Sequence, residues 1–382
     1  MQVAIAGGGI FGATGALELA RRGHRVTLVD PGPLPHPLAE STDISKVVRL
    51  DYGGDVEYTL LAERALDGWR AWNRSGDPLF HETGVMFLSR DPMSPGGFEH
   101  DSFALLTRRG HRLERLDGAA VARRFPAYRA GSFTDGYFNP QGGWVEASRV
   151  VERVLAEAIA LGVEVRTGCP ARAAGDDGSL VLADGTAIEA DQVLVAAGAW
   201  TPLLCPELAG ALRPVGQAVF HLRPDDPRDF AAHRFPVFGA DIARTGFYGF
   251  PLTGGVVKIG HHGPGVATEM QSDAREVPAA VEADLRALLA DALPGLAAAD
   301  IVHRRLCVYC DTADEHFWIA RSPDRPRLTV ATGGSGHAFK FAPVLGGLVA
   351  DAVLGLPVSE RFRWRPDRRA SGEEAARFRG GA

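Results

Sequence analysis

Lysine is scarce in this chain, and its three positions are the first residues to consider for chemistry. Of 41 lysine and arginine residues in a chain of 382, only Lys46, Lys258 and Lys340 are lysine. A genome biased towards arginine codons explains the many arginines, but it leaves open why these three lysines remain. Because lysine is a compact point charge whose pKa responds to burial, each of the three is a candidate functional residue.

A glycine-rich turn near the start of the chain predicts a nucleotide site. The G-x-G-x-x-G motif has the sequence Gly7-Gly8-Gly9-Ile10-Phe11-Gly12. Gly7 permits the tight turn, Gly9 lets the backbone approach a pyrophosphate, and Gly12 allows close helix–strand packing. A helix over 13–22 then directs its N-terminus at the phosphates, and Asp30 can accept hydrogen bonds from ribose hydroxyls. An ordinary glycine turn does not explain this whole order of elements, but the motif does not separate FAD from NAD.

Longer patterns show which elements must position these residues. Apolar spacing predicts helices over 55–74, 117–124, 145–161, 278–292 and 343–354, and strands over 84–89, 163–166, 192–198, 217–222, 246–251, 256–260 and 328–332. A second strand-to-helix glycine turn, at 333–336, returns the chain to the nucleotide. We therefore predict an α/β protein with a Rossmann-like nucleotide-binding domain (1–80, 141–212 and 318–382). The second domain is expected to be an α+β substrate domain built on an antiparallel sheet (81–140 and 213–317).

The composition argues against several classes of protein. The net charge is −6 and no basic run occurs, so nucleic acid is not an expected partner. No apolar run approaches the roughly 20 residues that span a membrane, and the first residues lack the charged start of a signal peptide. Four cysteines are too few for a disulfide framework. We expect a cytoplasmic protein without a bound metal.

Several sequence blocks, in the order in which they occur, resemble one family. Besides the opening turn they are Asp43-Ile44-Ser45-Lys46-Val47-Val48-Arg49-Leu50-Asp51-Tyr52-Gly53, Asp135-Gly136-Tyr137, Gly142-Gly143-Trp144-Val145, Tyr248-Gly249-Phe250-Pro251, Cys307-Val308-Tyr309, Asp314-Glu315-His316-Phe317 and Gly336-His337-Ala338-Phe339-Lys340-Phe341. Together they resemble the sarcosine oxidase and fructosyl-amino-acid oxidase group of the D-amino-acid-oxidase-type flavoproteins. The resemblance runs nearly end to end, and it implies FAD, not NAD, with the flavin ring between the two domains.

The resemblance also implies which residues hold the cofactor. In this group a cysteine matching Cys307 forms a thioether to the 8α-methyl carbon of the flavin, so a covalent FAD is expected. Cys310 lies three residues on, and a redox C-x-x-C is the alternative, although this stretch is predicted to be extended. The other expected cofactor-binding residues are Gly7, Gly9, Ile10, Phe11, Gly12, Asp30, Thr42, Ser45, Lys46, Gly334, Gly336, His337 and Lys340.

Two basic residues match positions that grip the substrate carboxylate in the sarcosine branch. They are Arg49 and Lys340. The planar fork of arginine suits a bidentate carboxylate, and lysine adds a second charge. The alternative for Arg49 is a structural salt bridge, with Asp51 or Asp55 as partner.

Three further residues are expected beside the substrate. Lys258 matches the family lysine near flavin N5, where a fixed positive charge in a dry site stabilises the charge that develops on dioxygen. Tyr309 and His262 match residues that line the substrate pocket. An aromatic or histidine side chain at such positions is also compatible with plain packing.

Different positions of this chain match different branches of the family. Lys46 and Thr42 stand where the sarcosine branch has an arginine and a histidine, which is closer to the fructosyl-amine and saccharopine-oxidase branch. Four positions after Lys258, however, the fructosyl branch tends to place an acid, and this chain has His262. The N-substituent of the substrate is therefore left open.

The predicted activity is the FAD-dependent oxidation of a small amine that bears a carboxylate, most simply an N-substituted amino acid. Hydride transfer to flavin N5 gives an imine that water hydrolyses, and reoxidation by dioxygen releases hydrogen peroxide. The alternatives are a dehydrogenase with another electron acceptor, a primary-amine oxidase of the glycine type, and a flavin-bearing subunit without catalysis. A monomer is expected from the habit of the group.

Overall fold

The glycine turn directly follows a central strand of the first sheet. The computed structural model describes residues 1–270, 274–368 and 373–380. Within them the strands of this sheet run in the order β20 (Trp318–Arg321), β21 (Leu328–Thr332), β13 (Gln192–Val195), β1 (Gln2–Ala6), β2 (Arg25–Asp30) and β9 (Glu164–Thr167). All neighbours are parallel except β20 and β21. This mostly parallel sheet fits the Rossmann-like domain that the sequence predicts.

Both faces of this sheet are covered, which explains why its strands read as continuous apolar runs. Val3 and Ile5 of β1 enter a core shared with helices α1 (Ile10–Arg21), α5 (Ala147–Ala160) and α9 (Ala342–Leu354). Ala4 and Ala6 face the opposite core, because successive strand residues point to opposite faces. The strands β10 (Ala171–Ala174), β11 (Ser179–Leu182) and β12 (Ala187–Glu189) and the helix α6 (Thr201–Leu204) cover that side.

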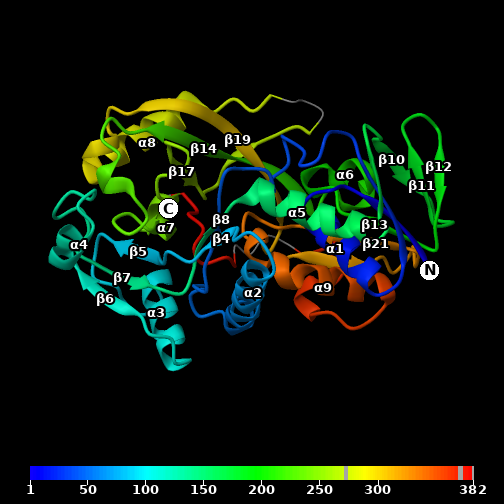
Figure 1. Ribbon diagram of the computed structural model, residues 1–382, viewed down its shortest axis with the longest axis horizontal. Helices are drawn as coiled ribbons and strands as arrows, with labels where there is room; N and C mark the ends of the chain where they lie inside the picture. The colour runs from blue at the N-terminus through cyan, green and yellow to red at the C-terminus, as the bar shows by residue number, and fades with distance from the viewer. Residues whose placement is uncertain (271–273, 369–372, 381–382) are drawn as a thin grey trace.

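The second sheet has nine strands and lies beside the first (Figure 1). Its order is β18 (Val266–Ala267), β14 (Leu212–Arg223), β17 (Val257–His261), β16 (Phe247–Gly249), β15 (Val237–Ala240), β5 (Val85–Ser89), β7 (Asp135–Asn139) and β6 (Glu114–Asp117), and β19 (Asp300–Thr312) pairs with β14. Neighbours are antiparallel except β15 and β5. That single parallel pair joins the strands from 85–139 to those from 212–312.

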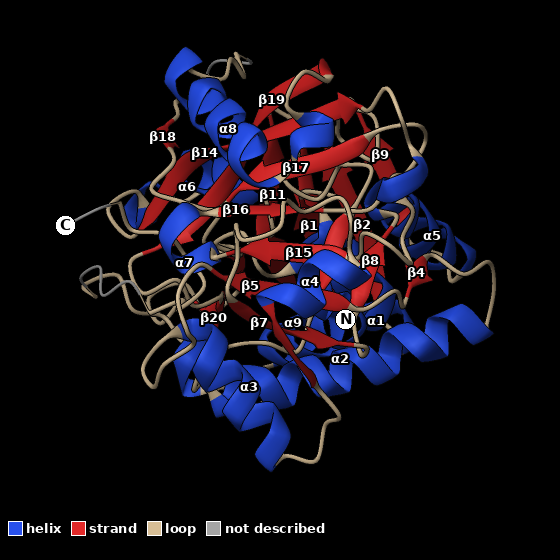
Figure 2. Cartoon of the chain, turned by 90° about the vertical axis from the view of Figure 1, so that its left-hand side faces the viewer, coloured by secondary structure: helices blue, strands red, loops and turns tan. Residues whose placement is uncertain are grey.

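Helices and a small third sheet pack around the two large sheets. Figure 2 shows α2 (Val56–Arg74) and α3 (Phe98–Arg108) on one side of the molecule, away from α8 (Ala279–Ala292). The short helices α4 (Gly118–Arg124) and α7 (Ile242–Thr245) flank the second sheet, and β3 (Lys46–Val48), β8 (Gly143–Val145) and β4 (Phe80–His81) form an antiparallel sheet of their own. The division into two discontinuous domains stays a prediction.

Most predicted elements are present, with two differences near the site. The first helix begins at Ile10 rather than near residue 13, so it starts inside the glycine motif. The helix α3 was not expected from the sequence, because its buried face includes Glu99 and Ser102. The Ser102 hydroxyl accepts a hydrogen bond from the backbone nitrogen of Gly53 at 2.8 Å, which ties α3 to the segment that carries Arg49.

Candidate active site

The opening turn has the backbone geometry that a pyrophosphate site requires. Gly7 has φ +105°, and a Cβ on Gly12 would lie 1.9 Å from the Gly7 carbonyl oxygen. Only glycine, which has no Cβ, can therefore occupy position 12. The carboxylate of Asp30 accepts hydrogen bonds from the backbone nitrogens of Gly8 at 2.8 Å and Gly32 at 3.1 Å. These contacts hold Asp30 at the end of β2.

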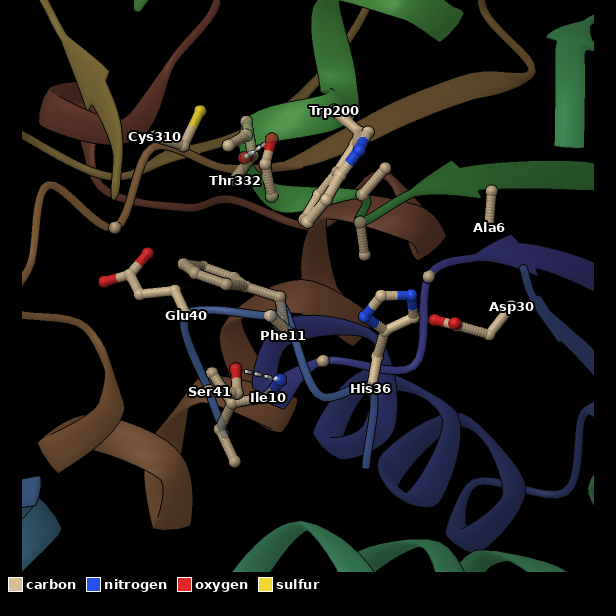
Figure 3. A pocket seen from close by; sticks show the side chains of 18 of the residues that line it. Ala6, Ile10, Phe11, Asp30, His36, Glu40, Ser41, Trp200, Cys310 and Thr332 are labelled. Atoms are coloured by element: carbon tan, nitrogen blue, oxygen red, sulfur yellow. Dashed lines mark hydrogen bonds between the residues drawn. The ribbon is translucent and has the colours of Figure 1, made fainter. Parts of the chain in front are cut away.

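A cavity of about 460 Å³ extends from this turn, a size typical of cofactor sites. Figure 3 shows Asp30 and His36 at one end, and Glu40 and Cys310 at the other. Of the predicted cofactor-binding residues, those that line it are Gly7, Gly9, Ile10, Phe11, Asp30, Lys46, Gly334 and Gly336. Glycine at two separate turns and a mostly apolar wall fit an elongated dinucleotide such as FAD. Glu40 also lines the cavity, although the sequence did not point to it, and burial raises its pKa to about 7.

Other predicted cofactor residues lie around the cavity rather than in its wall. Gly12 packs beneath the turn, and Thr42 and Ser45 have buried hydroxyls without a hydrogen-bond partner among the described residues. The backbone oxygen of Ser45 accepts a hydrogen bond from Lys258. His337 lines a smaller adjoining cavity instead. Most predicted residues of the glycine turn thus line the cavity, whereas Thr42 and Ser45 do not.

Cys307 faces away from Cys310, which removes the redox-pair alternative. On the extended strand β19, Cys307 belongs to a cluster with Tyr309 and lines neither of these cavities, whereas Cys310 packs in a different core and lines the large cavity. Both thiols are free. The Sγ of Cys307 is 3.9 Å from Nζ of Lys46. Burial lowers the pKa of Lys46, but the neighbouring Cys307 and Asp43 raise it by more. The net shift of this pKa is therefore upward.

Lys258 is buried and ion-paired, so it is no surface lysine. Its Nζ lies 2.7 Å from Oδ2 of Asp43 and 2.5 Å from the backbone oxygen of Ser45. The ammonium also lies 4.7 Å from the centre of the Phe250 ring. Burial lowers the pKa of Lys258 to about 8 against the opposing effect of Asp43, and Lys258 with its neighbours holds the pKa of Asp43 well below its usual value despite burial. The sequence did not single out Asp43 as the partner.

Arg49 and Lys340 are brought together by Tyr52, a residue whose role was missed. The Arg49 guanidinium stacks 4.6 Å from the centre of the Tyr52 ring. The Nζ of Lys340 donates to the Tyr52 hydroxyl at 3.0 Å and to the backbone oxygen of His337 at 2.7 Å. Burial and then Arg49 hold the pKa of Lys340 well below its ordinary value. The only hint in the sequence was the position of Tyr52 in the same block as Arg49.

The expected salt-bridge partners of Arg49 are wrong. Asp51 accepts a hydrogen bond from the Tyr137 hydroxyl at 2.7 Å, and Asp55 caps α2. Arg49 instead pairs with Glu374, at 3.1 Å between Nη2 and Oε1. Nothing in the sequence pattern pointed to Glu374, which lies 325 residues further along the chain.

A second cavity, of about 60 Å³, brings four of the five predicted catalytic residues together. Arg49, His262, Tyr309 and Lys340 all line it, together with aromatic and aliphatic side chains. Lys46, Gly336 and Phe339 line both cavities, so the two spaces adjoin. Lys258 does not line either one; it lies behind Phe250, which forms part of the small cavity's wall. The arrangement can hold a small anion beside the end of a cofactor.

Comparison with known proteins identifies the family. The model of the FAD-dependent oxidoreductases matches residues 2–352. The chain belongs to this family of FAD-dependent oxidoreductases. N-methyl-L-tryptophan oxidase of Salmonella arizonae is 30% identical over 356 residues, covering 92% of this chain and 94% of the relative. Monomeric sarcosine oxidase of a Bacillus species is 27% identical over 361 residues, covering 92% of each chain.

Solved structures give the same result for the fold. The fructosamine oxidase Amadoriase II of Aspergillus fumigatus has a TM-score of 0.83 at 27% identity, covering 99% of this chain and 93% of the other. The expected family, α/β fold, FAD dependence and oxidoreductase class are therefore confirmed. Within the described ranges no helix is long and apolar enough to cross a membrane, and no cluster of side chains there could hold a metal ion.

Proposed function

We propose that this FAD-dependent oxidoreductase oxidises the CH–NH bond of a small amine that bears a carboxylate, with N-substituted amino acids as the substrate class. The observation that carries the proposal is that Arg49 and Lys340, which both contact Tyr52, line one small cavity that adjoins the cofactor cavity. The relatives named for N-methyl-L-tryptophan and sarcosine, and the structure named for fructosamine, support this class.

The two cations would bind the carboxylate and so orient the carbon next to the amine. Burial and Arg49 lower the pKa of Lys340, and an incoming carboxylate would raise it, because an opposite charge favours the charged form. The positive charges near the cavity also favour the neutral form of the substrate amine, which has the lone pair that oxidation requires. FAD bound in the large cavity would supply the acceptor for the hydride equivalent.

We further propose that dioxygen is the oxidant and that Lys258 assists its reduction to hydrogen peroxide. A buried ammonium with one carboxylate partner supports this role, because a fixed charge in a dry site stabilises superoxide-like charge. Cys307, whose Sγ lies 3.9 Å from Nζ of Lys46, would hold the flavin covalently. A cytoplasmic monomer stays a prediction.

Paired substrates test the proposed function. The FAD-loaded protein is mixed without oxygen with sarcosine or N-methyl-L-tryptophan and, as matched controls, with dimethylamine or N-methyltryptamine, which lack only the carboxylate. Cyclic and fructosyl amino acids extend the panel. We expect flavin bleaching with at least one carboxylate-bearing amine and peroxide after air is admitted. Equal bleaching by the matched amines, or none by any amino acid, contradicts the proposal. Peroxide that fails to form while an artificial acceptor supports turnover favours the dehydrogenase.

A further inference from the structure

The C-terminal segment 373–380 places a carboxylate against two residues that line the cavity assigned to the substrate. Glu374 is buried, and its Oε1 lies 3.1 Å from Nη2 of Arg49. Its Oε2 lies 2.8 Å from Nε2 of His262. These are two of the groups that line the small cavity. The tail carboxylate therefore occupies the position at Arg49 that a substrate carboxylate would take.

The segment is anchored by contacts that do not involve the Glu374 side chain. Arg377 is buried and pairs with Asp311 at 2.7 Å and with Glu315 at 2.9 Å. The backbone nitrogen of Phe378 donates to the His262 oxygen at 3.1 Å. These anchors lie on β19, in the turn after it and in the loop after β17, so they hold the segment independently of the Glu374 side chain.

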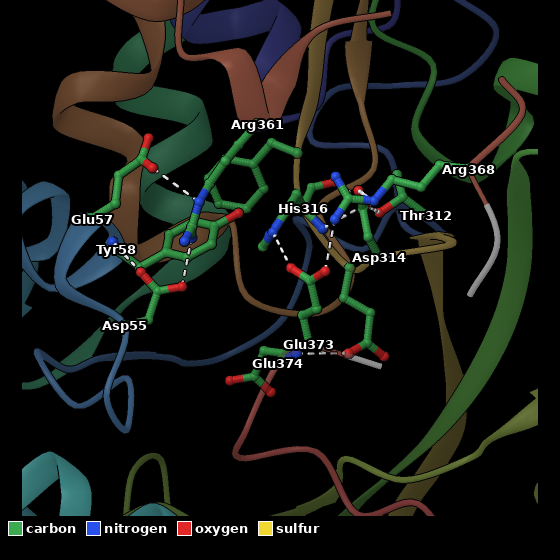
Figure 4. A network of polar contacts seen from close by, with 12 residues as sticks. Asp55, Glu57, Tyr58, Thr312, Asp314, His316, Arg361, Arg368, Glu373 and Glu374 are labelled. Carbon is green, nitrogen blue, oxygen red and sulfur yellow. Dashed lines mark hydrogen bonds and ion pairs between the residues drawn. The ribbon is translucent and has the colours of Figure 1, made fainter. Parts of the chain in front are cut away.

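Two neighbouring glutamates of the segment have different surroundings. Figure 4 shows Glu373 turned towards His316 and Arg368, and Glu374 pointing away from that network. The distances from Glu373 are 2.6 Å to His316 and 2.7 Å to Arg368. Glu373 is exposed, whereas Glu374 is buried. The pair offers a matched control, since both carboxylates belong to the same docked segment.

The size of the small cavity and the ion pairs of Glu374 both bear on how a substrate carboxylate reaches Arg49. At roughly 10–15 Å³ for each water-sized group, the 60 Å³ cavity holds about five groups, which excludes all but the smallest amino acids. His262 and Arg49 outweigh burial and keep the pKa of Glu374 well below its usual value, so protonation near neutral pH does not release it. The Nη1 of Arg49 is buried without a hydrogen-bond partner among the residues described. It offers an incoming anion a first contact.

We propose that Glu374 is a specificity-determining residue: an internal occupant of the carboxylate site that only a competing carboxylate displaces from Arg49 and His262. The inference rests on the proposed function, because it assumes that Arg49 binds the substrate. An amine without a carboxylate meets an arginine that is already neutralised and a cavity that is too small. A carboxylate exchanges with Glu374, and the side chain that leaves opens the space for the rest of the substrate.

Acetate binding to the FAD-loaded protein tests the exchange without turnover. Acetate is titrated into wild type, Glu374→Gln and Glu373→Gln, and its Kd is read from the flavin spectrum and from the rise in Tm. Losing one charged hydrogen-bond partner of Arg49 should tighten acetate binding about tenfold or more in Glu374→Gln. The Kd of acetate for Glu373→Gln should stay within about twofold of wild type, because Glu373 is exposed and exposed ion pairs contribute little. An unchanged or weaker affinity in Glu374→Gln, or an equal gain in Glu373→Gln, overturns the inference.

Substrate preference gives a second measurement that separates the inference from the proposed function. The ratio of kcat/KM for a carboxylate-bearing amine to that for its matched amine should fall in Glu374→Ala, because the matched amine gains space. A ratio that does not fall overturns the inference. If wild type oxidises the amino acid but the variants show no gain in acetate affinity, only the inference fails. If wild type neither binds acetate nor oxidises any amino acid, the proposed function fails with it.

Discussion

Replacing Asp43 by asparagine should move the pH dependence of flavin reoxidation. Asp43 is the carboxylate 2.7 Å from the buried ammonium of Lys258. An opposite charge at this distance shifts a pKa by about 1–3 units. Since burial already lowers the pKa of Lys258 to about 8, the loss of Asp43 should bring it to about 5–7. Asparagine keeps the size of the side chain, so the change is mainly one of charge.

The sign of the effect follows from which form of Lys258 assists dioxygen. The ammonium form exists below the pKa, so reoxidation in wild type should slow as the pH rises through about 8. In Asp43→Asn the same loss should occur at a lower pH. At pH 7.5 the protonated fraction falls from most of the protein to a few per cent for a pKa near 6, so reoxidation should slow by about tenfold or more.

The assay is stopped-flow reoxidation of the reduced protein by dioxygen between pH 5.5 and 9. Lys258→Met should be slow at every pH, and reduction by substrate should change less than reoxidation in both variants. Asp241→Asn is the matched control, because Asp241 is also buried and paired with a cation, Arg244, at 2.5 Å. An inflection that stays near pH 8 in Asp43→Asn, or a shift of equal size in Asp241→Asn, refutes the reasoning.

Three further predictions concern the cofactor and the carboxylate site. Acid-precipitated protein should stay yellow in wild type and in Cys310→Ser but turn colourless in Cys307→Ser; a colourless wild-type pellet rules out the covalent link. Tyr52→Phe removes a hydroxyl that hydrogen-bonds a buried ammonium, so KM for the amino acid should rise about tenfold or more, and an unchanged KM would show that the hydroxyl does not position the cation. Gly12→Ala should purify without FAD, because its Cβ would lie 1.9 Å from a backbone oxygen. Gly54→Ala is the control and should bind FAD normally, because a Cβ there has open space. Normal FAD binding by Gly12→Ala would contradict the proposed role of the turn.

The cofactor end of the site was predictable because its signal is local. The strand, turn, helix and terminal acid lie within thirty residues, and each step has a backbone reason that does not depend on the rest of the fold. Gly7 needs its positive φ, and Gly12 needs the absence of a side chain. Helices with a clear apolar stripe, such as α2, were predictable for the same reason. The helix α3 was not, since polar Glu99 and Ser102 interrupt its buried face.

The substrate end depends on contacts between distant segments, and there local reasoning failed. The nearest carboxylates in sequence, Asp51 and Asp55, were the expected partners of Arg49, but each has another partner. The actual partner, Glu374, lies in a tail without periodicity or motif. Its position is set by Arg377, whose ion pairs reach β19. Only the folded chain brings these charges together, because ion pairing selects for opposite charge and proximity, not for spacing along the sequence.

Two of the three lysines can now be explained beyond codon bias. Lys258 forms an ion pair with Asp43 and donates to one backbone oxygen, and Lys340 donates to Tyr52 and to one backbone oxygen. An arginine at either position would bring five N–H donors into a buried space that offers two acceptors, and unpaired buried donors are costly. Arginine also keeps its proton at every ordinary pH. Burial lowers the pKa of both lysines, so an ammonium at these two positions is a charge that the site can tune. Lysine persists at these two positions because each buried space fits a compact cation with few donors.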